Sequence, residues 1–96
     1  MREAMIEIPH PGGKGGVQKL FRFPNGYGAS VVQSPYSYGG DSGLWELAVI
    51  RYVEEDTDAF LLTYDTPITN DVIGYLDEQE VDALLEQISA LDVAND

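Results

Sequence analysis

The residues that could carry chemistry in this chain are few, and the first of them is its single histidine. His10 stands between two prolines in the stretch MREAMIEIPHPGG. A histidine that acts as a general base needs an orienting partner and a nucleophile, and no serine lies in a recognisable nucleophile context. One histidine without any cysteine also makes a catalytic zinc site improbable. The pattern therefore predicts an exposed arm residue and favours a protein that is not an enzyme.

Two short motifs resemble binding loops but do not meet their requirements. PGGKGG, residues 11–16, has the glycines and lysine of a phosphate-binding loop, but Gly15 follows Lys14 where that loop needs Ser or Thr. EEDTD, residues 54–58, gathers oxygen ligands for Ca²⁺ but lacks the glycine and distal glutamate of an EF-hand loop. We expect a linker and a solvated turn at these positions, with no metal or other cofactor.

A nine-residue loop, PYSYGGDSG at residues 35–43, has the composition of a binding loop. Tyrosine brings a large amphipathic contact area at low entropic cost, and glycine and serine bring adaptability. We predict that Tyr36, Tyr38 and Asp41 contact a partner. The alternative is a plain connection whose tyrosines cover the edge of a sheet.

Charge is distributed very unevenly along the chain. The net charge is −12, and all five basic residues lie within residues 1–53 beside only four of the 17 acids. Residues 54–96 therefore hold 13 acids and no base, which argues against direct binding to nucleic acid or to an anionic membrane. Such a surface steers a cationic partner, or it serves solubility alone. We predict a functional negative surface formed by the acidic turn and one helix face, comprising Glu54, Glu55, Asp56, Asp58, Glu78, Asp82 and Glu86.

A β-hairpin is the best-marked element in the first half of the chain. VQKLFRF (17–23) and YGASVVQS (27–34) have the composition of strands. Between them, Pro24 and Asn25 fit the central positions of a type I turn, and Gly26 can take the left-handed conformation that follows.

Further strands follow the hairpin. LWELAVIRYV (44–53) lacks glycine and proline and is predicted to be the central strand, and AFLLTYD (59–65) returns beside it. VIGYL (72–76) is a short apolar run. Residues 1–16 end in prolines and glycines, so we expect a flexible arm there and a single domain over residues 17–96.

The start of a C-terminal helix is marked by capping residues. Asp77 and Glu80 have the spacing of a capping box, and Leu76 and Val81 occupy the positions of a hydrophobic staple. Apolar residues then recur at helical spacing, at Val81, Leu84, Leu85, Ile88 and Leu91. The predicted fold is α+β, with an antiparallel sheet of about four strands and one C-terminal amphipathic helix packed on a face.

The strands are apolar on both sides, which one helix cannot cover. The predicted central strand presents Trp45, Leu47 and Val49 on one side and Ala48 and Ile50 on the other. The second side must meet the arm, the run at 72–76 or another subunit, and we favour a homodimer. The chain has no cysteine and no apolar stretch long enough to span a bilayer, so a cytoplasmic location is expected.

Three stretches carry a resemblance to known sequences: RFPNGYGASVV, YGGDSGLWELAVI and DTPITNDVIGYLDEQEVDALLEQISAL. Over about residues 17 to 92 the chain resembles small acidic proteins encoded by phages and prophages of actinobacteria. The resemblance transfers no functional residue. It implies a context in which small phage products bind and disable host proteins, including restriction or CRISPR components.

The leading hypothesis is therefore a non-catalytic module that binds a host protein with a basic surface, as a modulator or inhibitor of a nucleic-acid-binding or defence protein. One alternative is a protein that binds a small anionic ligand such as a nucleotide. Its pocket would lie at a dimer interface lined by Tyr27, Tyr36, Tyr38 and Trp45, with Arg22 and Arg51 meeting the ligand. Another alternative is an accessory protein of the virion or its assembly.

Overall fold

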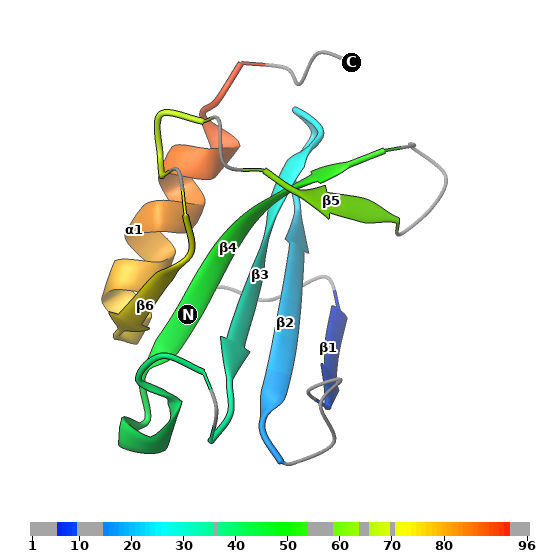
Figure 1. Ribbon diagram of the computed structural model, residues 1–96. Coiled ribbons are helices and arrows are strands. Elements are labelled where there is room, and N and C mark those ends of the chain that lie inside the picture. Colours follow the sequence, from blue (N-terminus) through cyan, green and yellow to red (C-terminus); the bar gives the residue numbers. More distant parts are fainter. Residues whose placement is uncertain are drawn as a thin grey trace.

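The computed structural model describes residues 6–9, 15–35, 37–53, 59–63, 66–69 and 71–92, and it shows an antiparallel sheet with one helix packed on a face (Figure 1). The elements are β1 (Ile6–Pro9), β2 (Val17–Arg22), β3 (Tyr27–Gln33), the 3₁₀ turn η1 (Gly40–Ser42), β4 (Trp45–Tyr52), β5 (Phe60–Leu62), β6 (Ile73–Leu76) and α1 (Glu78–Ser89). The α+β prediction is confirmed.

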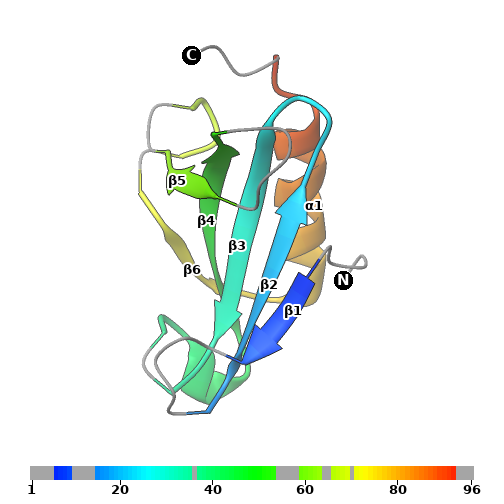
Figure 2. The same ribbon diagram turned by 90° about the vertical axis from the view of Figure 1, so that its right-hand side faces the viewer.

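All strand pairings in the described sheet are antiparallel, in the order β1-β2-β3-β4-β5. The strand β4 is central, and its second edge is shared by two short strands. Residues 50–52 of β4 pair with β5, and the stretch from Trp45 to Leu47 pairs with β6 through an irregular register. Figure 2 shows β5 and β6 one above the other along that edge.

The described sheet has two more strands than the four that the sequence predicts. Contrary to the expectation of an arm without regular structure, residues 6–9 form β1 and pair with β2. Ile6 lies opposite Leu20 and packs against it, so an apolar contact favours the strand ahead of the proline- and glycine-rich stretch. The rest of the predicted arm before residue 15 lies outside the described residues. The apolar run at 72–76 supplies β6, and the predicted strand at 59–65 is shorter, at 60–62.

The hairpin between β2 and β3 is confirmed with its predicted turn. The Gly26 N–H donates to the Phe23 carbonyl at 3.1 Å, and Gly26 has a φ of 88°, in the left-handed region that glycine adopts without penalty. The side chain of Asn25 has a second role. It is buried, and its amide donates to the carbonyls of Ile88 at 2.9 Å and Leu91 at 3.0 Å. The hairpin turn therefore caps the far end of α1.

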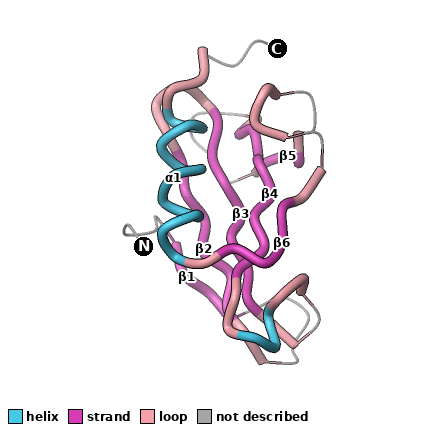
Figure 3. Tube along the Cα trace, turned by 90° about the vertical axis from the view of Figure 1, so that its left-hand side faces the viewer, coloured by secondary structure: helices cyan, strands magenta, loops and turns pink. Residues whose placement is uncertain are grey.

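The main core lies between α1 and one face of the sheet, and Figure 3 shows the helix lying alongside the strands. In α1, Val81, Leu85 and Ile88 are buried. They pack with buried strand residues that alternate along β3 and β4, namely Ala29, Val31, Trp45, Leu47 and Val49. Period-2 alternation in the strands and helical spacing in α1 thus converge on one layer of apolar side chains.

The opposite face of the sheet carries a smaller cluster of Leu20, Ile50 and Tyr52, with Ile6 and Phe60 packed against it. The ring of Phe60 meets that of Tyr52 edge-on, with centroids 5.9 Å apart. The guanidinium of Arg22 lies 4.3 Å from the Tyr52 ring centroid, within cation–π range. The chain's own residues therefore cover part of the second face, and the homodimer stays a prediction. The described helices include none long and apolar enough to cross a membrane.

Candidate protein-binding surface

The loop after β3 is held in a defined shape by its serines and glycines. The backbone N–H of Ser34 donates to Ser37 Oγ at 2.9 Å, and the N–H of Ser37 donates back to Ser34 Oγ at 3.2 Å. A Cβ at Gly40 would collide with the Ser34 carbonyl oxygen, so only glycine lets η1 approach β3 this closely. These contacts hold the loop against the end of β3 at Ser34 and Gly40.

The same loop docks on β6 through two tyrosines, Tyr38 and Tyr75, which we call the tyrosine pair. The Tyr75 N–H donates to the Tyr38 carbonyl at 3.1 Å. The two rings stack with centroids 6.5 Å apart and an interplanar angle of 28°. A side chain at Gly74 would strike the Tyr38 Cβ, so the loop and the strand are in close contact there. Both tyrosines nevertheless stay open to solvent, with exposed fractions of 60% for Tyr38 and 65% for Tyr75.

The backbone of Tyr75 is strained. Its φ is 58°, and it is the only non-glycine residue with a positive φ among the described positions. The left-handed conformation costs a residue with a Cβ about 1–2 kcal/mol, and such costs concentrate at functional sites. Here the strained residue presents a large, exposed aromatic ring, which contributes less to the core than a buried one would. The strained residue therefore marks a candidate for the functional site.

The helix acids begin directly after the tyrosine pair. β6 ends at Leu76, and α1 starts at Glu78, three residues after Tyr75. Glu78, Asp82 and Glu86, which we call the acidic ridge, recur every four residues along α1. Glu78 and Glu86 are exposed and Asp82 is half-buried. No basic residue lies in the last turn of α1.

The start of the helix is fixed by the predicted capping box. The Glu80 N–H donates to Asp77 Oδ1 at 2.8 Å, and the Asp77 N–H donates to Glu80 Oε1 at 3.0 Å. Leu76 and Val81, the predicted staple residues, are both buried in the main core. The junction between β6 and α1 is thereby anchored on both sides, so Tyr75 of the tyrosine pair and the first residue of the ridge lie on one anchored segment.

The remaining predicted contact residues are only partly described. Asp41 lies in η1, on the loop that carries Tyr38. Tyr36 and the acidic turn lie outside the described residues, as does His10; the turn comprises Glu54, Glu55, Asp56 and Asp58. The structure thus brings Tyr38 against Gly74 and Tyr75 of β6, the strand that precedes the helix, which the sequence did not indicate.

The residues of the predicted anionic-ligand pocket do not converge. Arg22 and Arg51 occupy alternate positions of the paired strands and project from opposite faces of the sheet. Trp45 is only 7% exposed, in the main core beneath the Lys19 ammonium at 5.1 Å. Tyr27 pairs with Arg51, whereas Tyr38 lies in the loop beyond the other end of β3.

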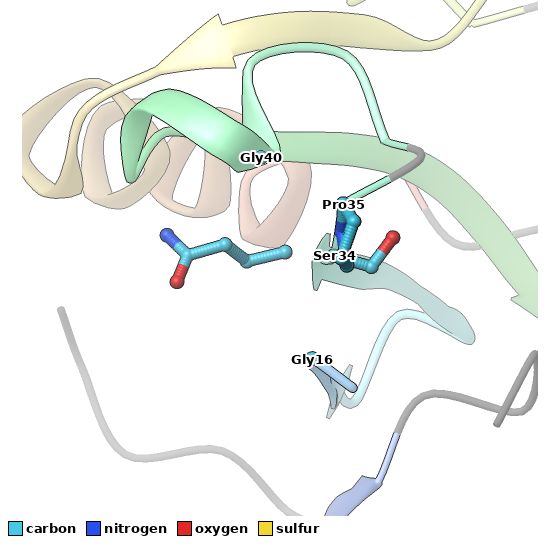
Figure 4. Close-up of a pocket in the computed structure, with 5 residues that line it drawn as sticks. Gly16, Ser34, Pro35 and Gly40 are labelled. Carbon is cyan, nitrogen blue, oxygen red and sulfur yellow. The ribbon is translucent and has the colours of Figure 1, made fainter. Parts of the chain in front are cut away.

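A cavity of about 200 Å³ lies beside the loop, lined by Gly16, Gln33, Ser34, Pro35 and Gly40 (Figure 4). Among the described residues its lining has no charged side chain. A Cβ at Gly16 would collide with the Gln33 carbonyl oxygen, so close backbone packing shapes this hollow. None of these five described residues supplies the positive charge that an anionic ligand needs.

Comparison with protein-family models, with curated proteins and with solved structures finds no match to this chain. Within the described residues no three of the metal-ligating types His, Cys, Asp and Glu gather into a cluster that could hold a metal ion.

Sequence reasoning did not single out Tyr75, the second member of the tyrosine pair. It lies in the apolar run VIGYL, whose pattern predicts only burial. A positive φ at tyrosine has no sequence signal, because the residue type disfavours that conformation. The preceding Gly74 is the one available hint, since glycine inside a strand often marks a close approach of another backbone.

Proposed function

We propose that this chain is a non-catalytic protein-binding module that recognises a partner with a basic surface. The observation that carries the proposal is the tyrosine pair, two exposed stacked rings displayed at the cost of a strained backbone beside the first acid of the ridge. Tyrosine is enriched at the energetic centres of protein interfaces, where its ring is buried and its hydroxyl finds a hydrogen bond.

The charge of the chain selects the kind of partner. With a net charge of −12 and no base after Arg51, the second half of the chain attracts cationic proteins and repels nucleic acid and anionic membranes. The ring faces of the tyrosine pair add a second attraction for Arg and Lys side chains, through cation–π contact. On the strength of the sequence resemblance, we propose that the partner is a host nucleic-acid-binding or defence protein, and that the chain is a phage-encoded modulator of it.

Affinity capture with matched variants tests this proposal. The chain is immobilised and exposed to an extract of an actinobacterial host, and each retained protein is quantified by mass spectrometry against increasing salt. A partner should be retained by the unmodified chain and released as salt rises, because surface charge attraction is screened. Its capture should fall when the ridge is neutralised by Glu78→Gln, Asp82→Asn and Glu86→Gln together.

The control removes the same number of charges elsewhere, by Glu7→Gln, Glu46→Gln and Asp92→Asn. These three acids lie on β1, on β4 and just after α1. If both triple variants lose capture equally, only net charge matters and the assignment to the ridge is wrong. Capture that is independent of both salt and neutralisation would contradict the electrostatic part of the proposal.

A substitution at Tyr75 separates binding from folding. Tyr75→Asn removes the ring, and asparagine accepts a positive φ better than most residues. We expect the free energy of unfolding to stay within about 1 kcal/mol of the unmodified chain, because relief of strain offsets the loss of a solvent-exposed stack. Partner capture should fall at least about tenfold, as expected for an interface hot spot. A stable variant with undiminished capture would exclude the tyrosine pair from the interface.

A further inference from the structure

The short strand β5 exposes apolar side chains on both of its faces. Leu61 is 54% exposed and Leu62 is 50% exposed, and Val53 beside them is 41% exposed. β5 stands at one end of the strand order, and no other described strand pairs with its outer edge (Figure 1). An apolar, unpaired strand edge is a template for another strand, and natural proteins usually protect such edges.

The strand at the opposite end of the order, β1, has the usual protection. Its Glu7 is exposed and pairs with Lys19 on β2 at 3.3 Å. Its Pro9 lacks the N–H that an added strand would need. β5, with the sequence Phe-Leu-Leu, has neither a charge nor a proline. The two ends of the strand order therefore differ, and of these two described strands β5 lacks the protection that β1 has.

The hydrogen bonds around β5 show which of its backbone groups point away from the sheet. Val53 N–H donates to the Ala59 carbonyl at 3.1 Å, and Thr63 N–H donates to the Val49 carbonyl at 2.9 Å. Residues 59 and 63 thus face β4, and so does Leu61 between them, because alternate residues of an antiparallel strand share one edge. The N–H and C=O groups of Phe60 and Leu62 consequently point outward.

The charge around β5 indicates the chemistry of the segment that fits it. Residues 54–65, which include β5, hold five acids and no base, four of them just before the strand and one after it. We propose that an extended segment of the basic partner, with apolar residues flanked by Lys or Arg, adds to the outer edge of β5 as a further strand. This mode of recognition uses main-chain hydrogen bonds for affinity and alternate side chains for specificity. The inference rests on the proposed function and names the segment that the partner offers.

A second copy of the chain fits this edge less well. Each copy carries a charge of −12, so self-pairing adds repulsion where a basic segment adds attraction. The two occupants also respond oppositely to salt. Screening weakens pairing with a basic segment and strengthens pairing between two acidic copies.

Amide hydrogen exchange with a synthetic peptide tests the inference. The probe is the heptapeptide Lys-Val-Lys-Val-Lys-Val-Lys, added to the isotopically labelled full chain and followed by NMR. The amides of Phe60 and Leu62 should exchange at least about tenfold more slowly with the peptide, because each N–H gains a hydrogen-bond acceptor. The amide of Leu61, which already faces β4, should change much less.

Two controls separate strand addition from general charge attraction. The same heptapeptide N-methylated at its interior residues keeps its charge but cannot donate from them, and it should neither protect Phe60 and Leu62 nor bind as tightly. Leu61→Thr with Leu62→Thr should weaken binding of the unmodified peptide several-fold, because apolar contact is lost while strand propensity is kept. Ile8→Thr, the matched change on β1, should leave binding unchanged.

Equal exchange of Phe60 and Leu62 with and without the peptide would overturn the inference. Protection already present without peptide, rising with protein concentration and with salt, would assign the edge to a second copy and would also overturn it. Suppose that the peptide does not protect Phe60 and Leu62, but a partner is still captured and the ridge and Tyr75 variants still reduce that capture. In that case only the inference about β5 is wrong. If the peptide protects β5 but the Tyr75 and ridge variants capture the partner as well as the unmodified chain does, the proposed binding surface is wrong.

Discussion

The two ends of α1 are stabilised in different ways. At the first end, Asp77 and Glu80 satisfy each other's backbone N–H groups over three residues of sequence. At the second end, where no base is present, the carbonyls of Ile88 and Leu91 accept hydrogen bonds from Asn25, more than 60 residues away. The second end also has local backbone bonds, from the Ala90 N–H to the Gln87 carbonyl and from the Leu91 N–H to the Ile88 carbonyl, and Asn25 adds a tertiary cap to them. The side-chain cap at the second end therefore depends on the hairpin being folded, whereas the capping box at the first end does not.

Removing the tertiary cap should have the largest effect. Asn25→Ala removes the side-chain donor to the Ile88 and Leu91 carbonyls and the acceptor of the Tyr27 N–H at 3.0 Å, whereas the Ile88 carbonyl keeps its bond from the Leu91 N–H. We expect the free energy of unfolding to fall by about 2–3 kcal/mol, the cost of stranding buried polar groups, as measured by urea denaturation.

Asn25→Asp serves as the control because aspartate also suits this turn and keeps the acceptor for Tyr27. It loses the donors and brings negative charge to the carbonyl end of a helix, so its destabilisation should equal or exceed that of the alanine variant. An aspartate variant as stable as the unmodified chain would show that Asn25 acts through the turn alone.

Removing the local cap should have a smaller effect. Asp77→Ala leaves the Glu80 N–H without its side-chain acceptor, and an N-cap of this kind contributes about 1 kcal/mol to stability. Asp77→Ser should recover most of the loss, since serine is an equally favoured N-cap. If the alanine variant loses more than Asn25→Ala in the same urea titration, the ranking of the two ends is wrong.

Adding the missing base should produce the smallest change, and it should be a gain. Gln87→Lys places a cation in the last turn, on an exposed position, and should raise the free energy of unfolding by about 0.3–1 kcal/mol at low salt. Gln79→Lys is the matched substitution in the first turn, where the dipole opposes a cation. The difference between the two variants should shrink as salt increases. An equal gain at both positions would mean that relief of net negative charge, and not the dipole, is the cause.

The locally determined parts of the fold could be predicted from sequence. The turn at Gly26, the capping box at Asp77 and the buried face of α1 each follow from residues within one or two turns of chain. The N-terminal strand could not be predicted, because β1 depends on the contact between Ile6 and Leu20 across the sheet. Local sequence patterns do not show that contact, and the proline- and glycine-rich stretch that follows β1 predicts a flexible arm.

The candidate site likewise has a part that the local sequence predicts and a part that depends on the tertiary structure. Tyr38 and the acids of the ridge were identified from residue type and helical spacing alone. The partner of Tyr38 was not, since the stack with Tyr75 joins a loop to a strand that begins about 30 residues later. The open edge of β5 depends on strand order, which short-range patterns do not determine.

The position of α1 in the chain has a consequence during synthesis. The ribosome releases β1 to β4 first, so the apolar face that includes Val31, Leu47 and Val49 is exposed to water until Val81, Leu85 and Ile88 have been translated. A nascent chain in this state is a substrate for chaperones. The acids encoded between β4 and α1 emerge just before the helix, and their mutual repulsion keeps unfinished chains apart while the last apolar layer is still missing.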